Sequence, residues 1–304
     1  MNRSHKKLVY FKSKDGFEVS AILTISKKRN DNELYSSPII IQVHGVLGNF
    51  LTRGTPRLLP PALFDVGVHS LSINTRMAFM GQIMESAIFD ETINDIDAAV
   101  KYLEKLGFQR IFILGYSLGA NLVAYYTSLK NSNNTKKNSN NTKGIILEGC
   151  SYSLPESQKA RLEKWESIPN YEDIYESAKH LLGSDPQQSK NDRIFVIYRA
   201  WGPTFNPIDC EMFSYKTWWF MRSPEADNAK TYKLIDKIKI PILFINGKND
   251  NIVEAWEPKE LKKILTRSGN NNIKMRLIPD AKHDCMENPK ATIAAISNWV
   301  RKIR

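Results

Sequence analysis

The pentapeptide Gly115-Tyr116-Ser117-Leu118-Gly119 constrains the fold more than any other feature of this 304-residue chain. It reads G-x-S-x-G, follows the β-branched and aromatic run at 110–114, and precedes a helix-forming stretch at 118–129. A strand, a sharp turn and a helix in this order would expose the Ser117 hydroxyl on a strained elbow. The flanking glycines have a physical reason, because a side chain at either position would collide where the strand and the helix cross.

A serine hydroxyl becomes a nucleophile only when a base, oriented by a carboxylate, takes its proton. Of the five histidines, only His283 lies in a loop after the last predicted strand, at 273–278. Asp250 follows a buried strand pattern and a glycine-containing loop. The chain order Ser117, Asp250, His283 is the order in which α/β-hydrolase sheets present nucleophile, acid and base.

Other carboxylates are alternatives for the acid. Glu148 ends the predicted strand at 144–149, where some members of this fold place their acid, while Asp280 and Asp284 flank the histidine. Asp250 is the preferred candidate because it lies at the end of a strand and before the base.

A tetrahedral oxyanion requires two backbone N–H groups directed at the same oxygen. The amide of Leu118, directly after the nucleophile, is one candidate. The amide of Val46, after His44-Gly45 and the apolar strand at 38–43, is the other. We expect the His44 ring to hold this loop, although it also borders the predicted substrate site.

These motifs together resemble the α/β-hydrolase superfamily, in particular its capped, serine esterase or lipase-like branch. The resemblance covers about 7–130 and 236–304 and departs from the usual pattern at Lys282, where the family often has glycine before the histidine. It implies an α/β-hydrolase fold: a mostly parallel eight-stranded sheet flanked by helices, with an inserted, mainly helical cap. The implied organisation is core at 1–150, cap or lid at 151–235 and core again at 236–304.

Hydrophobic patterns agree with this organisation, because strands alternate with helical segments as in βαβ units. Strands are predicted near 7–12, 17–25, 38–43, 68–73, 110–114, 144–149, 240–245 and 273–278. The main helices are predicted at 90–106, 118–129, 256–266 and 288–302. On the first of these helices, Asp95 and Asp97 are predicted to form the solvated face.

Substrate-binding candidates come from three places. The inserted segment is rich in aromatic residues, from which Trp201 and Trp218 are chosen. A small subdomain also needs aromatics for its own core, so the two roles remain open for each of them. Tyr116 adjoins the nucleophile, and Arg76 lies in an otherwise apolar loop after the fourth strand.

Composition limits the remaining classes. Three dispersed cysteines form no metal-ligand spacing, and there is no dinucleotide or P-loop fingerprint, so no cofactor and no metal are expected. Cys285 is expected to be a bystander near the base. The absence of a leader or of a long apolar run suggests a cytoplasmic protein without stable membrane association.

The net charge of +11 raises the possibility of nucleic-acid binding. However, residues 151–235 hold 11 basic and 12 acidic groups, whereas residues 1–30 hold 8 basic and 2 acidic ones. The excess therefore lies away from the segment expected to cover the substrate, and no nucleic-acid partner is predicted. A monomer or homodimer is expected.

The predicted function is hydrolysis of a small to medium apolar or aromatic carboxylic ester through an acyl-enzyme intermediate. A lactonase or thioesterase with the same triad is the nearest alternative. An acyltransferase or peptidase is more distant, and a non-catalytic ligand-binding protein that keeps the fold is a third possibility.

Overall fold

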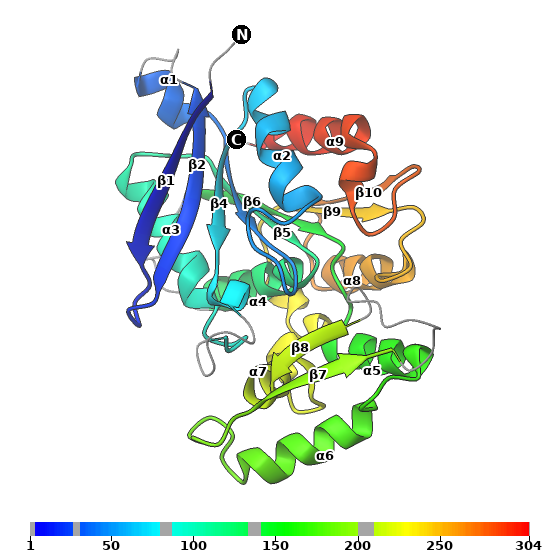
Figure 1. Ribbon diagram of the computed structural model, residues 1–304. Coiled ribbons are helices and arrows are strands. Elements are labelled where there is room, and N and C mark those ends of the chain that lie inside the picture. The colour runs from blue at the N-terminus through cyan, green and yellow to red at the C-terminus, as the bar shows by residue number, and fades with distance from the viewer. Residues whose placement is uncertain (1–3, 27–30, 80–86, 133–140, 200–209, 304) are drawn as a thin grey trace.

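The computed structural model describes residues 4–26, 31–79, 87–132, 141–199 and 210–303. Its centre is an eight-stranded sheet in the order β1-β2-β4-β3-β5-β6-β9-β10 (Figure 1). The pairs β1–β2 and β2–β4 are antiparallel, and the other pairs are parallel. The strands are β1 (Ser4–Lys12), β2 (Glu18–Ser26), β3 (Ile39–Val43), β4 (His69–Asn74), β5 (Ile111–Tyr116), β6 (Thr142–Glu148), β9 (Ile242–Gly247) and β10 (Ile273–Ile278).

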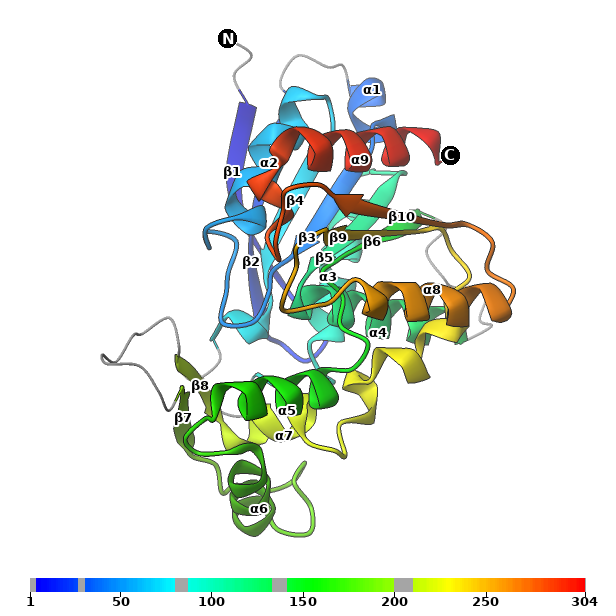
Figure 2. The ribbon, with the colours of Figure 1, turned by 90° about the vertical axis from the view of Figure 1, so that its right-hand side faces the viewer.

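Helices cover both faces of the sheet, as Figure 2 shows edge-on. One face carries α3 (Ile93–Lys105), α4 (Leu118–Ser132) and α8 (Trp256–Arg267), and the other carries α2 (Thr55–Asp65) and α9 (Pro289–Lys302). A short helix, α1 (Asp31–Ser36), precedes β3. The sheet packs against two hydrophobic cores, one on each face. In β3, Ile39 and Ile41 pack into one core and Ile40 into the other, because successive side chains of a strand point to opposite faces.

The described residues of the segment between β6 and β9 contribute no strand to the central sheet. They form three helices, an antiparallel strand pair and short 3₁₀ turns, which lie together at one end of the molecule (Figure 1). Its main elements are α5 (Leu154–Trp165), α6 (Tyr171–Leu182), β7 (Ile194–Tyr198), β8 (Cys210–Ser214) and α7 (Tyr215–Arg222). Its buried side chains belong to the same hydrophobic cluster as one face of the sheet.

The prediction of a mostly parallel eight-stranded sheet is confirmed, and the predicted strands and main helices agree with the observed bounds to within a few residues. The β7–β8 pair and the helices α1 and α2 were not among the predicted ranges. The β7–β8 pair arises because Phe195, Ile197 and Phe213 face inward from β-branched and aromatic runs. Helix α2 was missed because Pro60 and Pro61 lie inside it and suggest a loop.

Candidate active site

Ser117 lies between β5 and α4 with a positive φ of 54°, which is a strained backbone conformation for a residue other than glycine. The elbow is tight enough to exclude side chains at both flanking glycines. A Cβ on Gly115 would lie 2.2 Å from the Gly119 carbonyl oxygen, and a Cβ on Gly119 would lie 2.5 Å from that of Val43. The predicted reason for the two glycines is thus borne out by the geometry.

The structure brings the three predicted residues into one hydrogen-bonded chain. His283 Nε2 lies 2.9 Å from Ser117 Oγ, and His283 Nδ1 lies 2.9 Å from Asp250 Oδ2. The other carboxylate oxygen of Asp250, Oδ1, accepts the amides of Ile252 and Val253 at 2.9 and 3.0 Å. The Asp250 side chain is 1% exposed, so its position is fixed by the protein rather than by solvent.

The loops that carry Asp250 and His283 brace each other through their backbones. The amide of Asn249 donates to the Ala281 carbonyl at 2.9 Å, and a Cβ on Gly247 would lie only 1.7 Å from the Lys282 carbonyl oxygen. Lys282 itself is exposed. The main chain at Lys282 therefore makes the contact, and its side chain takes no part in it.

The His44-Gly45-Val46 loop adjoins the nucleophile. A Cβ on Gly45 would lie 3.2 Å from Ser117 Cβ, which shows how closely the loop approaches. Within the described residues, the amides of Val46 and Leu118 donate to no protein acceptor. Two unpaired amides beside a serine hydroxyl are the arrangement that an oxyanion needs.

His44 is a buried loop brace rather than a substrate-binding residue, which corrects that part of the prediction. Its side chain lies within 2.8 Å of the Gly45 carbonyl oxygen through Nδ1 and 3.0 Å from Thr75 Oγ1 through Nε2. Burial lowers the pKa of His44 to about 4, so the ring is neutral at physiological pH. The expected role of this ring in holding the loop agrees with these contacts.

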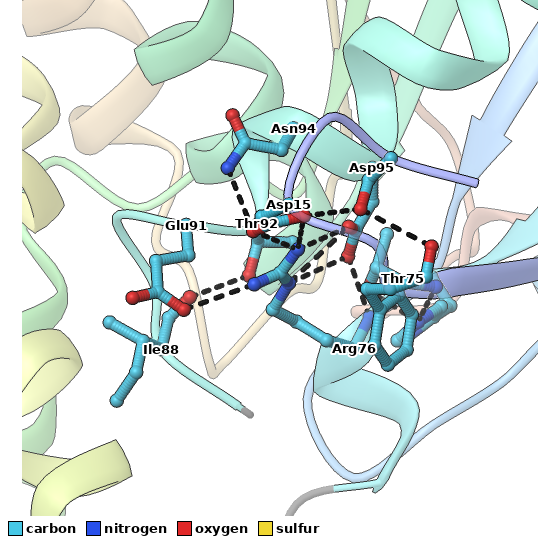
Figure 3. A network of polar contacts seen from close by, with 11 residues as sticks. Asp15, Thr75, Arg76, Ile88, Glu91, Thr92, Asn94 and Asp95 are labelled. Carbon is cyan, nitrogen blue, oxygen red and sulfur yellow. Dashed lines mark hydrogen bonds and ion pairs between the residues drawn. The ribbon is translucent and has the colours of Figure 1, made fainter. Parts of the chain in front are cut away.

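Arg76 does not bind substrate either, because it is the centre of a buried ion-pair network (Figure 3). It lies in the 3₁₀ turn η1 (Arg76–Phe79), and its side chain is 3% exposed. Its guanidinium lies 2.8 Å from Asp15, 3.0 Å from Glu91 and 2.8 Å from Asp95. The prediction that Asp95 lies on a solvated helix face is therefore wrong, since Asp95 is fully buried beneath this arginine.

The remaining predicted substrate residues have different outcomes. Trp218 is wholly buried and packs against Tyr171, 5.4 Å between ring centroids, so it belongs to the core of the inserted segment and not to a binding surface. Trp201 lies outside the described residues. Tyr116 is partly buried, and its ring centroid lies 5.5 Å from that of His283. Tyr116 therefore adjoins the base, and its role in substrate binding stays a prediction.

The alternative acids lie elsewhere. Glu148 is fully buried and contacts Thr55, while Asp280 is exposed at a turn with φ of 57°. Asp284 accepts the Thr55 amide at 3.2 Å. The carboxylate that contacts the His283 ring is that of Asp250.

A cavity of about 650 Å³ lies between α5 and the loop that follows Asp250. Aromatic and charged side chains share its walls, among them Tyr152, Trp165, Trp256, Arg161 and Glu254. Trp165 and Trp256 were not among the predicted substrate residues. The position of Trp256, six residues after the acid and at the start of a helix, could have indicated it.

Two classes of feature are absent from the part of the chain that the structure describes. No three histidine, cysteine or acidic side chains gather where they could hold a metal ion. No helix there is long and apolar enough to cross a lipid bilayer.

Solved structures with this architecture include esterase Pf2001 from Pyrococcus furiosus, at 16% identity and a TM-score of 0.63, covering 99% of this chain and 92% of that one. Est1E from Butyrivibrio proteoclasticus is 19% identical with a TM-score of 0.60, covering 97% of this chain and 98% of that one. No curated protein matches the sequence. The model of the serine hydrolase (FSH1) family matches residues 74–276, which is more than half of the chain and includes both the elbow and Asp250. The chain therefore belongs to the FSH1 family of serine hydrolases, and its fold is that of the α/β-hydrolases.

Proposed function

We propose that this protein hydrolyses carboxylic esters through Ser117, His283 and Asp250. The observation that carries the proposal is the continuous hydrogen-bonded chain from the Ser117 hydroxyl through His283 to Asp250, with both contacts at 2.9 Å. Such a chain is what a serine needs in order to be deprotonated as it attacks.

In the proposed reaction, His283 takes the Ser117 proton while the serine oxygen attacks the acyl carbon. The oxyanion that forms is held by the amides of Val46 and Leu118, and each such donor is typically worth roughly 3 kcal/mol in the transition state. His283 then protonates the leaving alcohol, and water repeats the cycle on the acyl-enzyme. Asp250 keeps the imidazole in the productive tautomer and stabilises its charged form.

The substrate is proposed to carry a small to medium apolar or aromatic acyl group, with residues 151–235 acting as the cap. The support is the cavity beneath α5, whose walls include Tyr152, Trp165 and Trp256. One solved structure of Est1E holds ferulic acid, an aromatic acid. Lactones and thioesters would pass through the same chemistry and form the nearest alternative substrates.

A fluorophosphonate probe is expected to label folded protein once, at Ser117, because the phosphorus acceptor needs the same activated hydroxyl and oxyanion amides as an ester. Mass spectrometry of the labelled peptide identifies the site, and Ser117→Ala provides the unlabelled control. A panel of aryl esters of graded acyl length, with lactones and thioesters beside them, then ranks the substrate classes. Folded protein that neither reacts with the probe nor turns over any ester would instead be a ligand-binding member of the fold.

A further inference from the structure

Glu148 is a buried carboxyl that the proposed mechanism does not use, although its backbone adjoins the nucleophile and the next residue adjoins the base. Its backbone carbonyl accepts the Ser117 amide at 2.8 Å, and its side chain is fully buried. The next residue, Gly149, touches the His283 ring so closely that a Cβ there would lie 2.8 Å from Cε1. A change at Glu148 can therefore reach both catalytic side chains.

A single hydroxyl links the side chains of two acids. Thr55 Oγ1 lies 2.7 Å from Glu148 Oε1 and 2.9 Å from Asp284 Oδ1. A threonine hydroxyl carries one hydrogen and can donate to only one of two carboxylates. The second short contact is a hydrogen bond only where one of the acids is protonated and donates to the threonine oxygen. Two hydrogen bonds at these distances are therefore possible only with one neutral carboxylic acid.

Asp284 has the environment of the charged partner. Its Oδ1 also accepts the amides of Thr55 at 3.2 Å and Met286 at 3.0 Å. The Thr55 amide belongs to the first turn of α2, whose N-cap is Gly54 and has no side-chain acceptor of its own. A carboxylate at a helix N-terminus is favoured by the unpaired N–H groups and by the helix dipole.

Glu148 has the environment of the neutral partner. The groups that face it are Thr55 from α2, Asp284 and Cys285 from the loop after the base, Tyr116 from β5 and Ile245 from β9. Within the described residues, no lysine or arginine pairs with it. Burial raises the pKa of Glu148 to about 7. The hydrogen bond from Thr55 opposes this rise, the charge of Asp284 adds to it, and hydrogen bonds from the amide and the thiol of Cys285 also oppose it.

We propose that Glu148 is a neutral positioning acid, which donates its carboxyl proton to Thr55 while Thr55 donates to Asp284. This relay joins the end of β6, the start of α2 and the loop after His283, and so holds the base at the nucleophile. The role in turnover rests on the proposed esterase function. When Glu148 ionises, two carboxylates share one hydrogen, so one contact becomes repulsive and the His283 loop is released.

The direction of the pH effect follows from the two states of Glu148. Its pKa is raised from an ordinary 4.5 to about 7 in the folded chain, so between these values the folded protein keeps a proton that the unfolded chain releases. Stability consequently falls as pH rises through this window. A glutamine at 148 can donate to Thr55 and cannot ionise, so it removes the dependence.

Infrared difference spectroscopy tests the proton directly and needs no activity. Glu257, whose pKa burial also raises to about 7, gives a protonated-carboxyl C=O band of its own in both proteins. The difference spectrum of wild type minus Glu148→Gln is therefore expected to show a further protonated-carboxyl band at pH 6, which disappears with rising pH. A difference spectrum without this band at pH 6 overturns the proposal. Because the measurement is independent of turnover, a failure of the relay and a failure of the esterase assignment are distinguishable.

Turnover tests the positioning role. In Glu148→Gln, the alkaline limbs of the kcat profile and of the thermal midpoint are expected to move to higher pH. Thr55→Val is expected to lower kcat about tenfold with KM unchanged, the value of one lost hydrogen bond, and Thr55→Ser should restore it. Alkaline limbs that do not move in Glu148→Gln contradict the relay. A loss of several orders of magnitude at every pH would instead make Glu148 an acid that acts on the base.

Discussion

Ser117→Ala is expected to lower kcat for ester hydrolysis by roughly 10⁶-fold, because all of the covalent chemistry depends on one oxygen. Stability should change little. The Ser117 hydroxyl makes its hydrogen bond with His283, whose ring is also held by Asp250. The nearby amides of Val46 and Leu118 do not donate to the serine oxygen, so its removal leaves neither amide newly unpaired. Stopped-flow and steady-state rates on an aryl ester, with circular dichroism of the same samples, check both statements.

Ser268→Ala is a matched control for this change. Its hydroxyl also makes one hydrogen bond, to the Leu265 carbonyl at 2.9 Å, but it lies at the end of α8 and away from the elbow. Full turnover is expected in the control. Turnover in folded Ser117→Ala at more than a hundredth of the wild-type rate would contradict the assignment of Ser117 as nucleophile.

The elbow and its two partners could be predicted from the sequence because each depends on local rules. Gly115 is required because the strand and the helix of the elbow meet directly, and this contact is encoded within five residues, whereas Gly119 is required by the approach of the helix to the backbone at the end of β3. Asp250 and His283 each follow a strand end, and the carboxyl ends of parallel strands meet at one edge of a sheet. Local sequence and topology were therefore sufficient to place these three side chains together.

The incorrect predictions concern residues whose role depends on distant partners. Arg76 was predicted to be available for substrate because its partner Asp15 lies 61 positions away in the chain, and no sequence pattern near either residue indicates the ion pair. Asp95 looked solvated because a carboxylate on a helix is usually exposed, whereas a buried arginine overrides that tendency. Trp218 could equally have served a pocket or a core, and only packing against Tyr171 decides between them.

Arg76→Ala is expected to lower the free energy of unfolding by about 3–5 kcal/mol, because it leaves the buried carboxylate of Asp95 without its cation. Asp95 is fully buried, and its Oδ2 also accepts the Arg76 amide at 2.8 Å, so it cannot turn to water. The arginine further stacks over Phe17, with 5.0 Å from the guanidinium carbon to the ring centroid. Urea unfolding of both proteins at pH 7 measures the difference.

Lys101→Ala is the matched control, because Lys101 also pairs with a carboxylate of α3, that of Asp97, but its side chain is 66% exposed. An exposed pair of this kind is worth about 0–1 kcal/mol. Similar losses in the free energy of unfolding for the two variants would contradict the idea that burial makes the Arg76 ion pairs strongly stabilising.

The pH dependence of the stability lost in Arg76→Ala distinguishes the loss of charge pairing from the loss of packing. Burial alone would raise the pKa of Asp15, but hydrogen bonds from Ser13, Asn94 and Arg76 outweigh it and lower the pKa to about 2. A lowered pKa gives stability that is present above the unfolded value of 3.8 and is lost as pH falls through about 2. The variant loses the arginine's contribution to this stabilisation. The difference in free energy of unfolding between wild type and variant should therefore shrink on acidification from pH 7 toward pH 3. A difference that stays constant over this range would mean that Arg76 acts through its packing on Phe17, and that the charges around it contribute little.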